Sequence, residues 1–186
     1  MKISAKAKMN KDNFYLIFAN LLDYPNEEKL SLFGKFENIV GFHHNEKIPS
    51  LDDLEIEYTK LFVNAHPFVP APPFASVYLN SENLYDEVES FYKSGGYAIE
   101  AREFPPDYLI YELVFLSNLL NDKKYKAERK FLSSHFLPWF VRFIEKVKKN
   151  DDTGFYSFIC EKIGVFLNNR LKELKDGETD LQKRVF

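Results

Sequence analysis

The amino-acid sequence predicts an all-α fold, a single-domain helical bundle with a Pro-rich loop. Apolar side chains recur at the three- and four-residue spacing of a helix through most of the 186-residue chain. Candidate N-cap residues precede several of these segments, and alternating apolar runs bounded by hairpin turns are nearly absent. A chain of this length buries one substantial core. We therefore expect one domain over residues 1–186, with frayed ends at 1–10 and 175–186.

Four helices are expected in the N-terminal half, each with its own start or stop signal. They span residues 11–22, 26–40, 50–62 and 81–94. Pro25 ends the first, because the residue before a proline is pushed out of the helical region. Asn26, Ser50 and Ser81 are expected to cap the other three, and Gly95 follows the fourth as a C-terminal stop.

The C-terminal half is expected to hold four more helices. They span residues 105–120, 123–134 and 136–149, with a long last helix after residue 153. Pro105 and Pro138 fit the first turn of a helix, where no backbone N–H is needed for intrahelical bonding. Thr153 is expected to cap the last helix.

The helix after Pro105 is expected to lie at the centre of the domain. It is apolar nearly all round, and Glu112 is the only charged residue between Tyr108 and Leu120. Burying an unpaired carboxylate is costly. Glu112 must therefore find a hydrogen-bond donor or have a raised pKa.

A segment between the third and fourth expected helices cannot be helical. Residues 63–74 carry four prolines among apolar side chains, and proline fixes φ and removes a hydrogen-bond donor. Solvent-exposed linkers are rich in Ser, Gly, Glu or Lys, which this segment lacks. We expect an extended loop that lies along an apolar surface, either of this chain or of a partner.

Composition excludes several classes of protein. A net charge of −3 without a recurring basic stripe argues against a nucleic-acid partner. No apolar run approaches the roughly 18 residues of a membrane span, so no membrane insertion is expected. The N-terminus lacks the apolar region of a secretory signal. Cys160, the single cysteine, fits a reducing, cytoplasmic location and a packed apolar environment.

Motifs of catalysis are absent from the sequence. There is no HExxH pair, no phosphate-binding Gly-rich loop and no GxSxG turn. Glu103 and Asp107 lie four residues apart, which suits general acid–base chemistry. Asp107 is better explained as a helix cap facing the positive end of the helix dipole. These motifs therefore assign no catalytic residue, no cofactor site and no metal site.

Three segments, taken together, resemble the TorD/DmsD/NarJ family of redox-enzyme maturation chaperones. The first is Tyr58-Thr59-Lys60-Leu61-Phe62 with Pro72-Pro73-Phe74-Ala75-Ser76-Val77-Tyr78 after the loop. The second is Glu103-Phe104-Pro105-Pro106-Asp107-Tyr108-Leu109, continuing through Glu112. The third holds Phe131, His135 and Trp139, followed by Phe155-Tyr156. The resemblance spans residues 54–167, and Tyr108 stands where many members carry histidine.

The resemblance implies a cytoplasmic chaperone that is not an enzyme. Its partners would be the N-terminal leader, often of the twin-arginine type, and the apo form of a molybdopterin oxidoreductase catalytic subunit. It would support cofactor insertion and assembly before export or membrane docking. As a hypothesis, apolar residues of the loop form the walls of a groove, while Glu103 and Asp107 meet the leader arginines. The candidate peptide-binding residues are Tyr58, Leu61, Phe62, Pro73, Phe74, Ser76, Tyr78, Glu103, Asp107, Tyr108 and Glu112.

Two other functions remain open from the residues alone. One is a helical adaptor that binds a folded redox partner and has no role in cofactor loading. The other is a small metal-binding helical protein that uses Glu112 with His66 or His135. The long Pro-rich loop is compatible with a monomer or a domain-swapped dimer.

Overall fold

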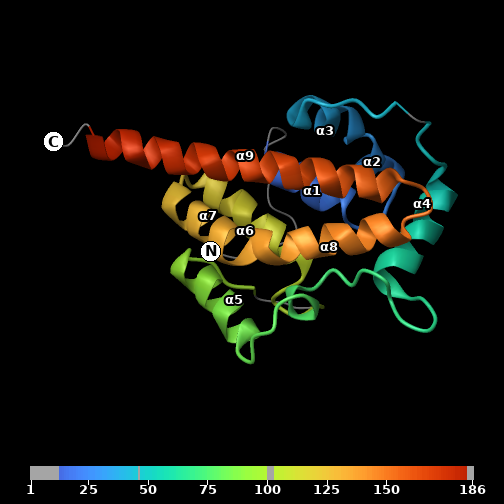
Figure 1. Ribbon diagram of the computed structural model, residues 1–186, viewed down its shortest axis with the longest axis horizontal. Coiled ribbons are helices and arrows are strands. Elements are labelled where there is room, and N and C mark those ends of the chain that lie inside the picture. The colour runs from blue at the N-terminus through green and yellow to red at the C-terminus, as the bar shows by residue number, and fades with distance from the viewer. Residues whose placement is uncertain (1–12, 46, 100–102, 184–186) are drawn as a thin grey trace.

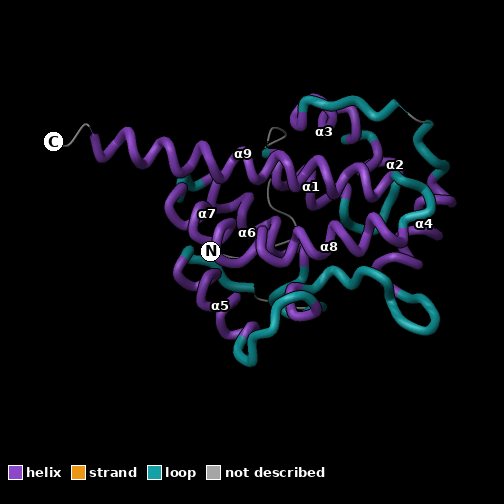
Figure 2. Tube along the Cα trace, viewed as in Figure 1, coloured by secondary structure: helices purple, strands orange, loops and turns teal. Residues whose placement is uncertain are grey.

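The computed structural model describes residues 13–45, 47–99 and 103–183, with side chains through residue 176. Within these ranges the chain is helical and forms no strand, as expected, and one isolated backbone bridge joins Phe74 to Tyr108 (Figure 2). Residues 1–10, for which fraying was expected, lie outside the described residues. The last helix continues through Lys183.

The helices pack against one another in layers (Figure 1). Their bounds are α1 Phe14–Leu21, α2 Glu27–Leu30, α3 Phe33–Val40, α4 Leu51–Tyr58, α5 Leu84–Ser94, α6 Leu109–Asn121, α7 Tyr125–Phe131, α8 Leu137–Asn150 and α9 Phe155–Lys183. Helix α6 packs against α1 and α7, and α9 runs along α8. Helix α5 and the Pro-rich loop lie on the side of α8 away from α9 (Figure 1).

The central position of α6 is confirmed, but its expected start is wrong. Nine of its 13 residues are buried. The helix begins at Leu109 and not at Pro105, because Tyr108 has an extended backbone. The Leu109 N–H donates to the carbonyl of Pro73, 2.9 Å away, instead of to a preceding helical turn. The two prolines therefore form a turn that leads into α6.

Two of the three expected caps in the N-terminal half are confirmed. The side chain of Asn26 accepts from the Lys29 N–H at 2.9 Å, and the Ser50 hydroxyl accepts from the Asp53 N–H at 3.2 Å. The expected cap at Ser81 is wrong. Its hydroxyl donates to the Glu87 carboxylate at 2.9 Å, and α5 begins three residues later.

The expected helix over residues 26–40 is divided into α2 and α3. Its break follows Leu30, where the Ser31 hydroxyl donates to the carbonyl of Glu28 at 2.6 Å. A side chain that bonds to the backbone in this way competes with helix continuation. The break lets Phe33 and Phe36 both turn into the core.

Helices α7 and α8 were expected to be separate, and the structure joins them. A π-helical turn, Leu132–Phe136, connects them without a loop. Pro138 follows this turn and has no N–H to donate to the preceding turn. The wider π-helical turn absorbs this missing bond, as π-bulges commonly do within long helices.

Aromatic side chains fill the core. The largest fully buried ones include Trp139, Tyr15 and Tyr156. Cys160 is free and buried, as expected. In the described part of the chain, no helix has both the length and the apolar character required to cross a membrane.

Candidate functional site

The Pro-rich loop is fastened to the entrance of α6 by backbone bonds. Besides the bond from Leu109 to Pro73, the Ala75 N–H donates to the Asp107 carbonyl at 3.1 Å. The Ser76 N–H donates to the Asp107 carboxylate at 2.7 Å. The loop is therefore extended and ordered by packing on its own chain, and it brings two of the resembling motifs together.

Asp107 holds the loop and does not cap its own helix. Its side chain is 0% exposed, and one carboxylate oxygen accepts the Ser76 N–H. The other oxygen has no hydrogen-bond partner among the described residues. The expected capping role is therefore wrong, because the helix starts two residues later. In this conformation, an arginine of a ligand has no access to the Asp107 carboxylate.

We expect Asp107→Ala to destabilise the protein more than Asp107→Asn. Asparagine retains an oxygen that accepts the Ser76 N–H, whereas alanine leaves that partly buried donor without its partner. The difference should be about 1–3 kcal/mol in the free energy of unfolding. Urea denaturation of the two variants measures it. If both variants lose the same free energy of unfolding, the bond from the Ser76 N–H to Asp107 does not hold the loop.

Three aromatic rings pack together beside this junction, with Phe104 toward solvent and Tyr108 buried. The ring of Phe104, which is 38% exposed, lies 4.5 Å from the ring of Tyr108 and 6.2 Å from that of Phe74, between centroids. Glu103 is exposed at the edge of this cluster, and its N–H donates to the Tyr111 hydroxyl at 3.3 Å. Of the two predicted arginine-binding carboxylates, Glu103 alone faces solvent.

Several predicted groove walls lie in the core in this conformation. Leu61, Phe62 and Tyr78 are all buried. The Phe62 ring contacts those of Phe143 and Tyr156, with centroids 5.8 and 5.4 Å apart. Core packing alone therefore accounts for these side chains.

Tyr58, another predicted site residue, is also buried. Burial raises the pKa of Tyr58 and also that of Tyr108, so both hydroxyls stay neutral at physiological pH. Near the junction, the exposed apolar side chains are those of Val77 and Phe104, and Phe68 projects from the tip of the loop.

Glu112 finds donors within the core, as the sequence requires. One of its oxygens lies 2.6 Å from Nε2 of His135, and the other accepts from the indole N–H of Trp139 at 2.9 Å. Burial raises the pKa of Glu112, and His135 and Trp139 oppose that shift in part. Burial alone would lower the pKa of His135, but the Glu112 carboxylate raises it above its ordinary value.

The described residues do not include a cluster of side chains that would support the metal-binding alternative. Glu112 and His135 do meet, but no group of three or more His, Cys, Asp or Glu side chains in these ranges has a metal-binding arrangement. His66 is exposed in the Pro-rich loop, whereas Glu112 and His135 are both buried.

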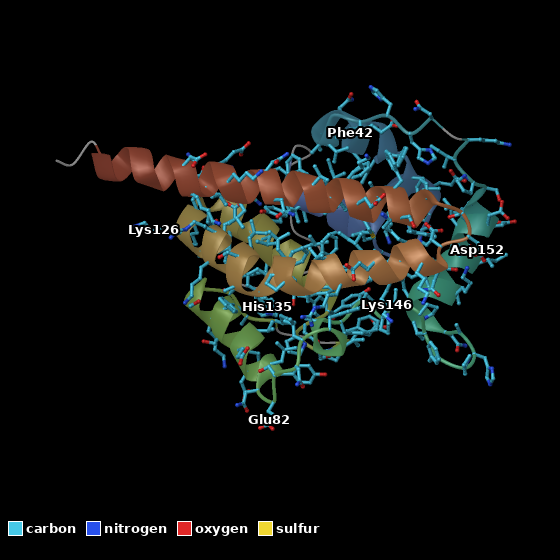
Figure 3. The ribbon with its side chains drawn as sticks, in the orientation of Figure 1. Phe42, Glu82, Lys126, His135, Lys146 and Asp152 are labelled. Carbon is cyan, nitrogen blue, oxygen red and sulfur yellow. The ribbon has the colours of Figure 1, made fainter. Side chains whose placement is uncertain are left out.

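An acidic pocket that was not predicted from the sequence adjoins the junction. It has a volume of about 300 Å³ and is lined by Ser76, Ser81, Glu82, Asn83, Leu84, Tyr85 and Asp86. Glu82 and Asp86 are exposed, no cationic side chain lines the pocket, and Glu82 points away from the ribbon (Figure 3). The acid-rich start of α5 was the available signal, but it was interpreted only as a capped helix.

Ser76 connects the acidic pocket to the rest of the site. Its N–H is held by Asp107, and the residue itself lines the pocket. The acidic side chains, the aromatic surface and the fastened loop therefore belong to one region. Such a region can bind a cationic segment that also carries apolar side chains.

Comparison with known proteins identifies relatives of the chain. The model of the nitrate reductase delta subunit family matches residues 22–145. A Haemophilus influenzae protein named as a probable Tat proofreading chaperone, DmsD, is 29% identical over 109 residues, which are 56% of this chain and 53% of that protein. The chaperone protein TorD of Vibrio parahaemolyticus is 26% identical over 131 residues, 61% of this chain and 60% of TorD. The chain thus matches little more than half the length of these two relatives.

A third relative, which matches more of the chain, and a solved structure indicate the same family. TorD of Actinobacillus succinogenes is 28% identical over 162 residues, covering 84% of this chain and 81% of that protein. The crystal structure described as a redox enzyme maturation protein of Archaeoglobus fulgidus is similar, with a TM-score of 0.62 and 25% identity. It covers 89% of this chain and 98% of that one. The chain therefore belongs to the nitrate reductase delta subunit family, within the TorD/DmsD/NarJ group of redox-enzyme maturation chaperones, which are not catalytic enzymes.

Proposed function

We propose that this protein is a cytoplasmic chaperone for one molybdopterin oxidoreductase. It binds the N-terminal, arginine-bearing leader of the apo catalytic subunit and supports cofactor insertion and assembly before export or membrane docking. The protein acts as a single domain, as a monomer or a domain-swapped dimer. The names of its relatives support the chaperone role, and the region around Ser76 supports the kind of ligand.

The observation that carries the proposal is the acidic pocket beside exposed aromatic side chains. In the described part of the chain, neither Glu82 nor Asp86 forms an ion pair, so both carboxylates are available to a cationic ligand. Arginine bonds carboxylates through two parallel N–H groups, which favours arginine over lysine. Val77 and Phe104 offer apolar contact for the stretch that follows the arginines.

In this proposal the predicted site residues take two roles. Glu103 and Phe74 contribute to the exposed surface, while Asp107, Ser76 and Pro73 hold its shape through the backbone bonds described above. The buried members stabilise the helices beneath it. These are Tyr58, Leu61, Phe62, Tyr78, Tyr108 and Glu112.

We expect the variant Glu82→Gln/Asp86→Asn to bind a synthetic twin-arginine leader peptide about tenfold more weakly than the unchanged protein. The loss corresponds to two charge-assisted contacts at a partly exposed site. Isothermal titration calorimetry measures it. A peptide with both arginines replaced by glutamine should bind the unchanged protein about as weakly.

A matched control separates local from general charge effects. Glu145→Gln removes an exposed carboxylate of α8 that does not line the acidic pocket, and it should leave the affinity unchanged. If the double variant and Glu145→Gln bind equally well, the acidic pocket is not the leader site. If only mature, cofactor-replete enzyme is bound and no leader peptide, the adaptor function replaces the proposed one.

A further inference from the structure

A second cavity, the basic cleft, lies at the other end of α5 from the acidic pocket. Its volume is about 830 Å³. It is lined by Ser94, Leu120, Lys123, Lys124, Tyr125, Lys126, Ala127, Arg129, Arg170, Glu173 and Leu174. Figure 3 shows Lys126 beside α7 and Glu82 at the lower end of α5, apart from each other in this view. The two cavities share no lining residue.

The charge of the basic cleft is opposite to that of the whole chain. Five cationic side chains and a single carboxylate line it, although the chain carries a net charge of −3. Such a concentration of one sign attracts ligands of the other sign.

Arg170 and Lys124 are held by neighbouring groups. Arg170 forms two bonds with the buried carboxylate of Glu128, from Nε at 2.9 Å and from Nη2 at 3.1 Å. Lys124 donates to the Gly95 carbonyl at 2.9 Å and lies 3.2 Å from Asp122. These contacts hold both side chains in place along the wall of the cleft.

The remaining lysines are available. Lys123 and Lys126 are exposed and form no ion pair with any residue that the structure describes. Lys123 adopts a left-handed backbone with φ of 56°, which lysine rarely takes. Such conformations are costly and are retained where the surrounding structure requires them. This conformation forms the turn that places consecutive lysines at the mouth of the cleft.

The floor of the basic cleft is apolar and aromatic. Leu120, Ala127 and Leu174 line it, and the ring of Tyr125 is 46% exposed beside them. The Arg170 guanidinium lies 5.7 Å from the centroid of that ring. A hydrophobic floor with a few cationic groups at the rim is typical of sites for small organic molecules of this size.

From this combination we infer that the basic cleft binds a small organic anion, with a phosphate or similar anionic group on an aromatic or apolar body. Lys123 and Lys126 contact the anionic group, and Tyr125 with the leucines contacts the body. Inorganic phosphate alone would leave the apolar floor uncovered. The inference does not depend on the leader site, because different residues form the two cavities.

Binding of 1-naphthyl phosphate to the full chain tests this inference. We expect saturable binding in calorimetry, at least tenfold tighter than binding of inorganic phosphate. Lys126→Glu should weaken it about tenfold, because the substitution reverses a charge at the rim. Lys146→Glu makes the same charge change at an exposed position of α8 and should have no effect (Figure 3). Circular dichroism confirms that both variants are folded.

Three results would overturn the inference. Binding of 1-naphthyl phosphate no tighter than that of inorganic phosphate would show that the apolar floor is not used. Equal losses in Lys126→Glu and Lys146→Glu would show attraction to overall charge and not to the cleft. Absence of saturable binding would rule out the site. Leader binding in the same samples is a separate measurement and stays unchanged in Lys126→Glu.

Discussion

Replacing His135 with alanine is expected to lower the free energy of unfolding by about 3–5 kcal/mol, because it leaves a buried carboxylate without its charged partner. Glu112 and His135 are both buried, and the atoms that join them lie 2.6 Å apart. After the substitution, only the indole N–H of Trp139 bonds to Glu112. Urea denaturation followed by circular dichroism measures the loss.

The double variant Glu112→Leu/His135→Leu is the matched control. Replacing a buried pair by apolar side chains is often neutral for stability, whereas breaking the pair is costly. The double variant should therefore be clearly more stable than His135→Ala. The single variants Glu112→Leu and His135→Leu complete the comparison. If the double variant loses as much stability as these two losses added together, the two residues do not act as a pair.

The pair of Glu112 and His135 also makes the stability of the protein depend on pH, in a direction that follows from the raised pKa of His135. The pKa of His135 is raised by Glu112 in the folded protein, so the folded state holds this proton more tightly than the unfolded state. This contribution to stability is complete below the ordinary histidine pKa of about 6.5 and is lost as pH rises through the raised pKa. Stability measured from pH 6 to 9 should fall in the unchanged protein and fall less in His135→Gln.

Replacing Arg170 with methionine should cost about 3 kcal/mol of stability, for a related reason. The Glu128 side chain is 0% exposed and accepts two bonds from Arg170 and one from the Tyr15 hydroxyl at 2.8 Å. Methionine fills part of the space but leaves the carboxylate with the tyrosine alone. Thermal and urea unfolding should both show the loss.

Arg170→Met/Glu128→Gln tests whether the buried charge is responsible. Glutamine removes the charge and can still accept from Tyr15, so the double variant should be more stable than Arg170→Met. Equal stability of the single and double variants would mean that Glu128 tolerates the loss of its partner. The loss of stability in Arg170→Met would then come only from the lost packing of the arginine side-chain stem.

Much of the fold follows from local signals in the sequence. Asn26 and Ser50 cap their helices as predicted, and the apolar character of α6 places it at the centre. The errors concern competing interactions that local patterns do not show. Pro105 satisfies the rule for a helix start, but the bond from Leu109 to Pro73 depends on a loop more than 30 residues away.

The candidate site was less predictable, because exposure depends on tertiary packing. Asp107 and Phe62 belong to the motifs that carry the family resemblance, yet both are buried in this conformation. Carboxylates at a helix start favour the helix dipole whether or not they bind a ligand. The sequence therefore could not distinguish Asp86 in the acidic pocket from an ordinary first-turn acid.

The way the Pro-rich loop is attached has a consequence for its tip. The bond from the Ala71 N–H to the carbonyl of Leu61 closes the loop at its base, and the bonds of Pro73 and Ala75 with the start of α6 hold the residues that follow. Phe68 lies within this closed loop, is 72% exposed and takes part in neither attachment. A protease cut or an inserted tag there would leave both halves fixed to the body, so the tip is the natural place to label this protein without disturbing what it binds.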